Sequence, residues 1–285
     1  RLAEQADKLA YHAVRGELWD KAAHYLLQAG QKSIRLSAYR DALAHLSLGL
    51  DALARLPGTP EHLSMELDYR VSIGSIQLAT LGWAAPQVLQ TYARARQLCD
   101  AVGYTPRLFP VLWGIATFYL IRSEIDLAVD AAQRFLALAQ DSEDDAPAMV
   151  GEFLMGNTLH WTGDLVRTRT HLEAGLVRYD ARRHGSLADA YGQDIKVSAL
   201  TYKGWTLWYQ GLPDQALRCH DDAVQLATQM NHVHSIAYAD GVRLFGLQLR
   251  GATKELLERG AKAIAFADER GVGFFAAFDR VLRAW

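Results

Sequence analysis

The sequence predicts an all-α protein, built as a right-handed α-solenoid of stacked antiparallel helical hairpins. Apolar residues recur at steps of three and four along most of the chain, which is the period of an amphipathic helix. The breaks between these segments are short and contain Gly and Pro, as expected when consecutive helices pack side by side. Small residues recur at matched places in successive segments, which indicates an internal repeat.

Composition excludes several classes of protein. The chain has 285 residues, of which 50% are hydrophobic, and a net charge of -2, so it can bury a core and is not disordered. The near-neutral charge argues against nucleic-acid binding. The most apolar run, residues 108–121, is too short to span a membrane and contains Pro110, so it predicts a buried helix. We therefore expect neither nucleic acid nor membrane as a partner.

The two cysteines, Cys99 and Cys219, are far apart and provide neither a disulfide framework nor a cysteine-based zinc site. No metal and no cofactor are predicted for this chain. It begins at Arg1 without a signal peptide, so we expect a piece of a larger cytoplasmic protein. The oligomeric state stays open.

The elements follow in chain order. Residues 1–56 are expected to form N-terminal helices that lead into the solenoid, and residues 57–285 to form the repeats. Residues 125–139 illustrate the pattern, with Ala128, Ala132 and Phe135 on one face and Asp126 and Asp130 on the other.

The repeats fit the tetratricopeptide pattern. A first helix carries a small and a large residue, a short turn follows, and a second helix carries a small residue, a large residue and another small residue. Small side chains let paired helices approach closely, and large ones fill the space between hairpins. The three clearest copies contain Ala116, Tyr119, Ala128, Ala132 and Phe135; Gly156, Leu159, Thr168, Leu172 and Gly175; and Gly204, Leu207, Ala216, His220 and Ala223. Weaker copies run through Tyr39, Ala42, Leu46 and Gly49, through Gly82, Val88, Tyr92 and Ala95, and through Gly251, Leu256, Gly260 and Ala263.

The repeat length differs from the standard one. The equivalent residues Ala128, Thr168, Ala216 and Leu256 lie 40, 48 and 40 residues apart, whereas the tetratricopeptide unit has about 34 residues. Longer helices or loops are therefore expected. The last segment ends in an apolar stripe from Phe274 to Trp285, which suggests that the last repeat is truncated.

Several runs resemble the C-terminal tetratricopeptide-repeat region of large bacterial signalling proteins. These proteins carry an adenylate or guanylate cyclase domain ahead of an AAA-type ATPase domain. The resemblance rests on residues 30–42 (GQKSIRLSAYRDA), 92–99, 108–114, 191–194 and 213–217. It departs at Ile195-Lys196, where the family has Pro-Gly, so the shape of that loop is not predicted. The resemblance implies a repeat module and places no cyclase or ATPase site in this chain.

Motifs for chemistry are absent from the sequence. There is no phosphate-binding P-loop, no nucleophile elbow and no His-Glu-x-x-His pair. Cys219, His220 and Asp221 include metal-ligand types, but adjacent residues point to different helix faces, so His220 is interpreted as a packing residue. His232 and His234 are interpreted as a solvated start of a helix rather than as a ligand pair.

We expect the binding surface on the concave side, where the first helices of stacked hairpins form a groove. Aromatic side chains with amide and imidazole groups between them suit recognition of a peptide or protein segment. The alternative is that several of these aromatics are inter-helix core. The predicted groove residues are Trp113, Thr117, Phe153, Asn157, His160, Trp205, Trp208, Tyr238, Phe245 and Gln248.

Three functional hypotheses follow. The leading one is a non-catalytic scaffold and sensor module that binds a peptide, a protein or an effector, including the parent's own ATPase or cyclase domains, and regulates the catalytic domains. The second is the repeat domain of an ATP-dependent LuxR-type transcription activator. The third is an enzyme on a helical scaffold, which would need titratable groups converging in one pocket. No spacing in the sequence supports the third.

Overall fold

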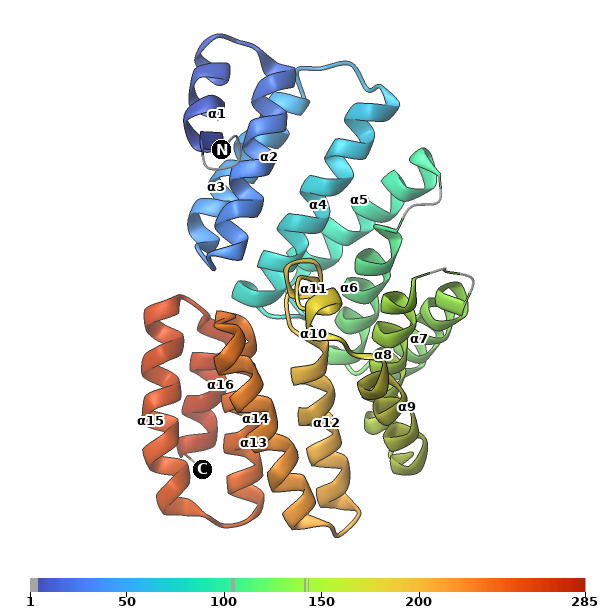
Figure 1. Cartoon of the computed structure of the whole chain (residues 1–285), viewed down its shortest axis with the longest axis vertical. Helices are drawn as coiled ribbons and strands as arrows, with labels where there is room; N and C mark the ends of the chain where they lie inside the picture. Colours follow the sequence, from blue (N-terminus) through green and yellow to red (C-terminus); the bar gives the residue numbers. More distant parts are fainter. Residues whose placement is uncertain (1–4, 104–105, 141, 143, 285) are drawn as a thin grey trace. The chain divides into compact units, whose positions relative to one another are not determined.

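The computed structural model describes residues 5–103, 106–140, 142 and 144–284, and every regular element in these ranges is a helix (Figure 1). The helices are α1 (Ala6–Arg15), α2 (Trp19–Arg35), α3 (Tyr39–Leu53), α4 (Pro60–Leu81), α5 (Pro86–Val102), α6 (Leu108–Ile121), α7 (Ile125–Gln140), α8 (Asp145–Thr162), α9 (Leu165–Arg178), α10 (Ala181–His184), α11 (Leu187–Tyr191), α12 (Ile195–Tyr209), α13 (Pro213–Met230), α14 (Val233–Leu249), α15 (Thr253–Arg270) and α16 (Gly273–Ala284). The predicted all-α hairpin repeats are confirmed, as are the helices expected at 108–121 and 125–139.

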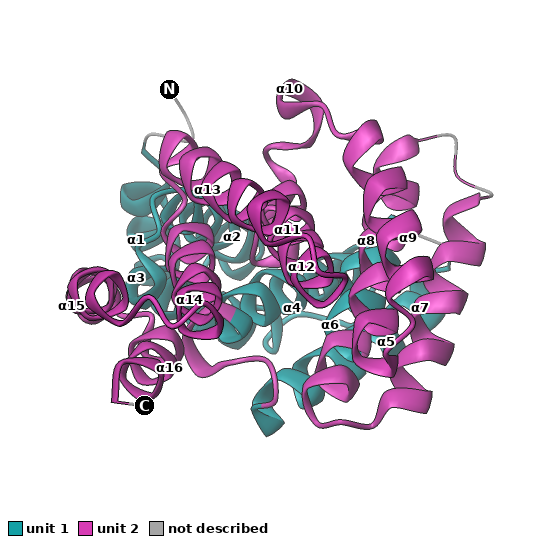
Figure 2. Ribbon diagram, turned by 90° about the horizontal axis from the view of Figure 1, so that it is seen from below, with its two compact units in different colours: residues 1–78, 85–115 teal, residues 79–84, 116–285 magenta. Residues whose placement is uncertain are grey.

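The chain divides into two compact units (Figure 2). Residues 1–78 and 85–115 form the first unit, and residues 79–84 and 116–285 form the second. Two of the three boundaries interrupt helices, since α4 and α6 each contribute to both units. The expected division at residue 56 stays a prediction.

In the first unit, a tyrosine from one helix fills the space left by glycines on two others. The fully buried ring of Tyr92 on α5 lies against Gly74 and Gly114, where an added Cβ would lie 2.5 and 2.2 Å from ring atoms. An ion-pair network ties α4 to α5, because Glu66 accepts hydrogen bonds from both Arg70 and Arg94. The packing of Tyr92 against two glycines is the pairing of small with large residues that the repeat pattern predicts.

In the second unit, first helices pack on one another and each packs on its own second helix. The hairpins are α8 with α9, α12 with α13, and α14 with α15, and contacts join α8 to α12, α12 to α14, and α14 to α16. The repeat positions Ala128, Thr168, Ala216 and Leu256 are each the fourth residue of their helix and are all buried. The predicted register of the second helices is therefore confirmed.

The longer spacing of 48 residues has a structural cause. Two short helices, α10 and α11, lie between α9 and α12, where the other repeats have a simple connection. The residues that depart from the family pattern, Ile195 and Lys196, form the start of α12, after Gly192 with its left-handed φ of 74° and the buried Asp194. The Asp194 carboxylate accepts hydrogen bonds from the Val197 N–H at 2.8 Å and from the Tyr179 hydroxyl at 2.9 Å, which starts α12 at a fixed place.

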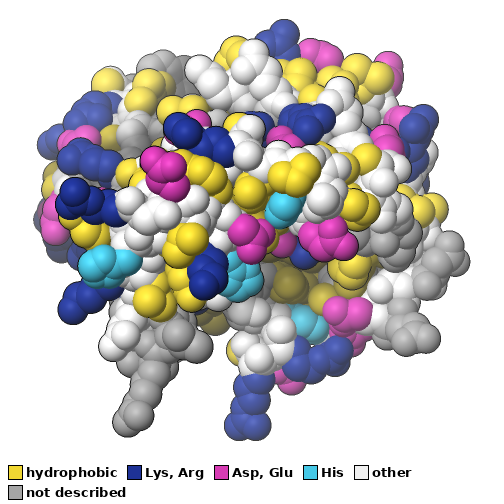
Figure 3. Space-filling view, turned by 90° about the horizontal axis from the view of Figure 1, so that it is seen from above, with side chains coloured by type: hydrophobic (Ala, Val, Ile, Leu, Met, Phe, Trp, Pro, Cys, Tyr) yellow, Lys and Arg dark blue, Asp and Glu magenta, His cyan; other side chains and the backbone are white. Residues whose placement is uncertain are grey.

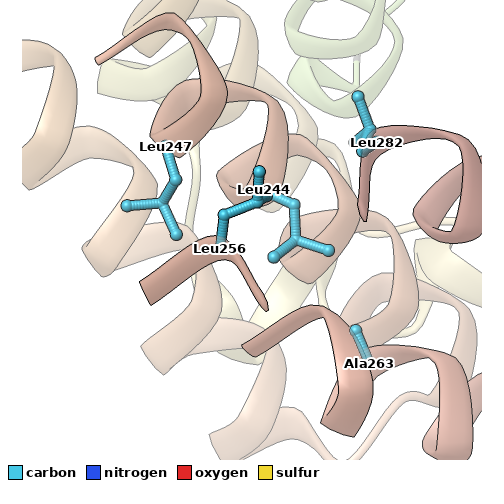
Figure 4. Packing of buried hydrophobic residues seen from close by; sticks show 5 residues of the cluster. All are labelled: Leu244, Leu247, Leu256, Ala263 and Leu282. Atoms are coloured by element: carbon cyan, nitrogen blue, oxygen red, sulfur yellow. The ribbon is translucent and has the colours of Figure 1, made fainter. Parts of the chain in front are cut away.

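The last helix covers part of the apolar stripe expected there. Leu282 of α16 packs with Leu244 and Leu247 of α14 and with Leu256 and Ala263 of α15 (Figure 4). Phe275 is also buried, whereas Phe274 and Val281 are exposed. Trp285 lies outside the described residues, and truncation of the last repeat stays a prediction.

Candidate binding face on α8, α12 and α14

Capping residues set where the helices of this face begin. Asp144 accepts a hydrogen bond from the Ala146 N–H at 3.1 Å at the start of α8, and Asp194 caps α12. His232 caps α14, because its Nδ1 accepts the Ser235 N–H at 3.3 Å. The Asp194 N–H donates to the Ser235 hydroxyl at 3.0 Å, so the starts of α12 and α14 are joined.

The interpretation of His232 and His234 as a solvated start of a helix is wrong for His234, which is fully buried.

Six rings from the three first helices form one contact network, which we name the aromatic face. Its members are His160 and Trp161 of α8, Tyr202, Trp205 and Tyr209 of α12, and Phe245 of α14. His160 stacks on Trp205 at a centroid distance of 6.0 Å and an angle of 28°, and Trp205 meets Phe245 at 5.3 Å and 78°. His160, Tyr202 and Trp205 are buried and Phe245 is half-buried, but Trp161 and Tyr209 are 51% and 53% exposed. The network therefore consists of two exposed rings, Trp161 and Tyr209, that pack on rings buried beneath them.

His160 is the polar centre of the aromatic face. Its Nδ1 lies 3.1 Å from the Thr206 hydroxyl oxygen, and that hydroxyl donates its own hydrogen to the Tyr202 carbonyl at 2.8 Å. Nδ1 is therefore the donor, and Nε2 carries the lone pair. Burial lowers the pKa of His160 to about 4 and raises that of Tyr202 to about 12. Both side chains are neutral at neutral pH, so the face is uncharged.

Several polar atoms next to the rings have no hydrogen-bond partner within the described residues. They are Asn157 Oδ1, Trp205 Nε1 and Gln248 Oε1, one from each first helix. Asn157, Trp205 and Phe245 are separated by 48 and 40 residues, which are the repeat spacings found on the second helices. All three atoms are buried, so their missing hydrogen bonds are a cost to the folded state and are not open to a ligand on the surface.

The structure brings some of the predicted groove residues together and buries others. His160, Trp205 and Phe245 belong to the aromatic face, with Asn157 and Gln248 on the same helices. Phe153, Asn157, Thr117 and Tyr238 are buried in the second unit, and Trp113 is buried in the first. Trp208 is half-buried and lines a hollow together with Trp205 of the aromatic face, Pro213 and Arg250. The groove as a whole stays a prediction.

Trp161, Tyr202 and Tyr209 were missed by sequence reasoning. Trp161 and Tyr209 also lie 48 residues apart, so the repeat spacing could have identified them as equivalent. Tyr202 carried no such signal, because its equivalent in the preceding hairpin is Leu154.

The other candidates behave as packing or surface residues. His220 is buried between α12 and α14, where a Cβ on Gly204 would lie 2.3 Å from its Nε2 and one on Gly246 would lie 2.8 Å from its Nδ1. The packing interpretation of His220 is confirmed. Asp221 instead pairs with Arg243 at 2.8 Å. Within the described ranges, no three metal-ligating side chains converge.

In the view of Figure 3, acidic and basic side chains are interspersed. None of the helices in the described part of the chain combines the length and apolarity needed to cross a bilayer.

Fold and site together define a helical-repeat protein with an aromatic face on its first helices. Comparison with solved structures finds the same fold in a structure described as a Rap protein complexed with Competence and Sporulation Factor. It has a TM-score of 0.68 and 14% sequence identity, and it covers 98% of this chain and 80% of that chain. The apo form of RapI is similar with a TM-score of 0.57 and 11% identity over 92% of this chain and 97% of that chain. At such identity the likeness concerns the fold alone.

No family model matches the sequence, and no curated protein matches it either.

Proposed function

We propose that this chain is a non-catalytic scaffold module that binds a peptide or protein segment on the aromatic face. The observation that carries the proposal is the pair of exposed rings, Trp161 and Tyr209, which lie 48 residues apart, at the repeat spacing, on an uncharged base. Exposed aromatic rings on a rigid base give contact area at low entropic cost. A protein of the same fold was solved in complex with a factor, which is consistent with this use of the fold.

The test uses a phage-displayed library of random peptides selected on the wild-type chain. Peptides that bind the aromatic face should lose at least about tenfold in affinity when Trp161 and Tyr209 are both replaced by Ala, since each aromatic anchor contributes about 1 kcal/mol or more. Tyr11→Ala is the matched control, because Tyr11 is 56% exposed and lies in the first unit. Equal binding of the selected peptides to wild type and to the double variant would contradict the proposal.

We further propose, from the resemblance of residues 30–42 and the related runs, that the module belongs to a multidomain signalling protein with cyclase and ATPase domains. In such a parent, ligand binding would bias the arrangement of the hairpins and thereby regulate nucleotide turnover. The test is to delete residues 1–285 from the full-length parent and measure cyclase and ATPase rates. Unchanged rates, both with and without a selected peptide, would count against this regulatory role.

A further inference from the structure

The loop between α4 and α5 reaches helices that come much later in the chain. Residues 79–84 group with the second unit, although most of α4 and all of α5 belong to the first. Trp83 lies in this loop and is only 7% exposed. A loop side chain is thus buried among repeat helices to which it is not adjacent in sequence.

Trp83 packs against two rings of α14. Its ring centroid lies 5.7 Å from that of Tyr238, at an angle of 33°, and 6.2 Å from that of His234. Phe275 of α16 closes the group edge-on, at 5.2 Å from His234 and 5.9 Å from Tyr238. Tyr238, His234 and Phe275 therefore form one aromatic cluster on α14 and α16, which we name the box, and the indole of Trp83 packs against its Tyr238 and His234 walls.

The backbone of the loop is shaped for this approach. Gly82 has a left-handed φ of 86°, and a Cβ there would lie 2.8 Å from Cδ2 of Phe274. Any other residue would be strained and would also clash with the Phe274 ring. The glycine thus lets the loop pass closely over α16 just before Trp83.

His234 acts as a wall of the box rather than as a hydrogen-bonding group. It is fully buried, and neither ring nitrogen has a partner among the described residues. Burial lowers the pKa of His234 to about 3, so the ring is neutral at neutral pH. The box is therefore flat-sided, aromatic and uncharged, which favours an aromatic occupant over a charged or branched one.

We propose that the box between α14 and α16 is a binding pocket for an indole side chain, and that the chain fills this pocket with its own Trp83. The walls come from helices that pack on each other as repeats, whereas the occupant comes from a connecting loop. This pocket is distinct from the aromatic face, so the proposal does not depend on the ligand of that face.

The experiment replaces the occupant and supplies indole from solution. Trp83→Ala should leave a dry apolar pocket that binds free indole, as engineered apolar cavities bind small aromatic molecules. At millimolar indole, the melting temperature of Trp83→Ala should rise by several degrees through mass action, while that of the wild type stays constant. Leu81→Ala is the matched control, because Leu81 lies next to the same loop and is 52% exposed. No indole-induced shift in a cooperatively folded Trp83→Ala, or an equal shift in Leu81→Ala, would overturn the proposal.

A second measurement covers the case in which Trp83→Ala does not fold. The wild-type chain is labelled with 5-fluorotryptophan, and the fluorine resonance of residue 83 is assigned by its loss in Trp83→Phe. We expect this resonance to be insensitive to exchange of H₂O for D₂O, whereas that of Trp161, which is 51% exposed, should shift. A solvent-sensitive resonance for residue 83 would mean that the box is not filled by Trp83, and would overturn the proposal.

Discussion

Replacing Gly204 by Ala tests the packing rule on which the repeat stack depends. An added Cβ would lie 2.3 Å from His220 Nε2, 2.4 Å from its Cδ2 and 3.1 Å from the Ala216 carbonyl oxygen. The His220 ring cannot move away from Gly204, because Gly246 lies against its opposite edge. A Cβ on Gly246 would lie 2.8 Å from His220 Nδ1. Helices α12, α13 and α14 would all have to shift.

The expected cost follows from two opposing effects. Forcing an extra methyl group into a packed core costs about 1–3 kcal/mol. Ala in place of Gly within a helix returns up to about 1 kcal/mol. The free energy of unfolding should therefore fall by about 1–2 kcal/mol. Gly260→Ala is the matched control, since Gly260 is also helical but its Cβ would meet only the Arg283 side chain at 3.5–3.7 Å. That variant should gain about 0.5–1 kcal/mol.

The assay is urea unfolding followed by circular dichroism at pH 7, with each variant made alone and in a His220→Ala background. In that background the steric conflict is gone, so Gly204→Ala should become neutral or stabilising, and the double-mutant cycle should give a coupling energy above about 1 kcal/mol. If Gly204→Ala matched Gly260→Ala while His220 was present, the proposed close packing of small against large residues would be refuted.

Three further predictions concern buried polar groups, and circular dichroism melting across a pH series checks each of them. The buried Asp279 carboxylate has no hydrogen-bond partner within the described residues, and burial together with Asp240 raises its pKa to about 7. The folded state holds this proton more tightly than the unfolded one, so stability should fall as pH rises from about 4 to 7. Asp279→Asn should remove this slope and gain up to about 4 kcal/mol above pH 7; an unchanged slope would contradict the assignment. The lowered pKa of His160 has the opposite effect, since its contribution is complete above about pH 6.5 and is lost towards pH 4. His160→Gln should therefore flatten the acid limb, and a limb as steep as that of the wild type would exclude His160 as its source. Asp194→Ala should cost about 1–2 kcal/mol through loss of the α12 cap, whereas Asp194→Asn should keep most of it; equal losses in both would show that the cap is not the cause.

The second helices were predictable because their two sides face different surroundings. In α13, the small residues Ala216, Ala223 and Ala227 and the ring of His220 face the partner helices, and most of the remaining positions meet solvent. A helix with one buried side carries a 3.6-residue period that fixes its register. That period is sufficient to assign the repeat spacings of 40 and 48 residues from the sequence alone. The short helices α10 and α11 could not be predicted, since four or five residues carry no measurable period.

The sequence pattern of the first helices does not show which side chains form the proposed binding face, because these helices are buried on more than one side. Helix α8 is enclosed by α7, α9 and α12, and its residues from Met149 to His160 are buried on nearly every side. Such a helix is apolar all round, so the hydrophobic period no longer says which side chain faces a groove and which faces a neighbour. Phe153 and Tyr238 were therefore indistinguishable by pattern from Trp161 and Tyr209. What separates them is position along the helix, because Trp161 and Tyr209 lie at the C-terminal ends of α8 and α12, where the neighbouring helices leave about half of each side chain exposed. The proposed binding face is therefore marked by exposed rings at equivalent helix ends, and not by aromatic residues in the middle of the helices.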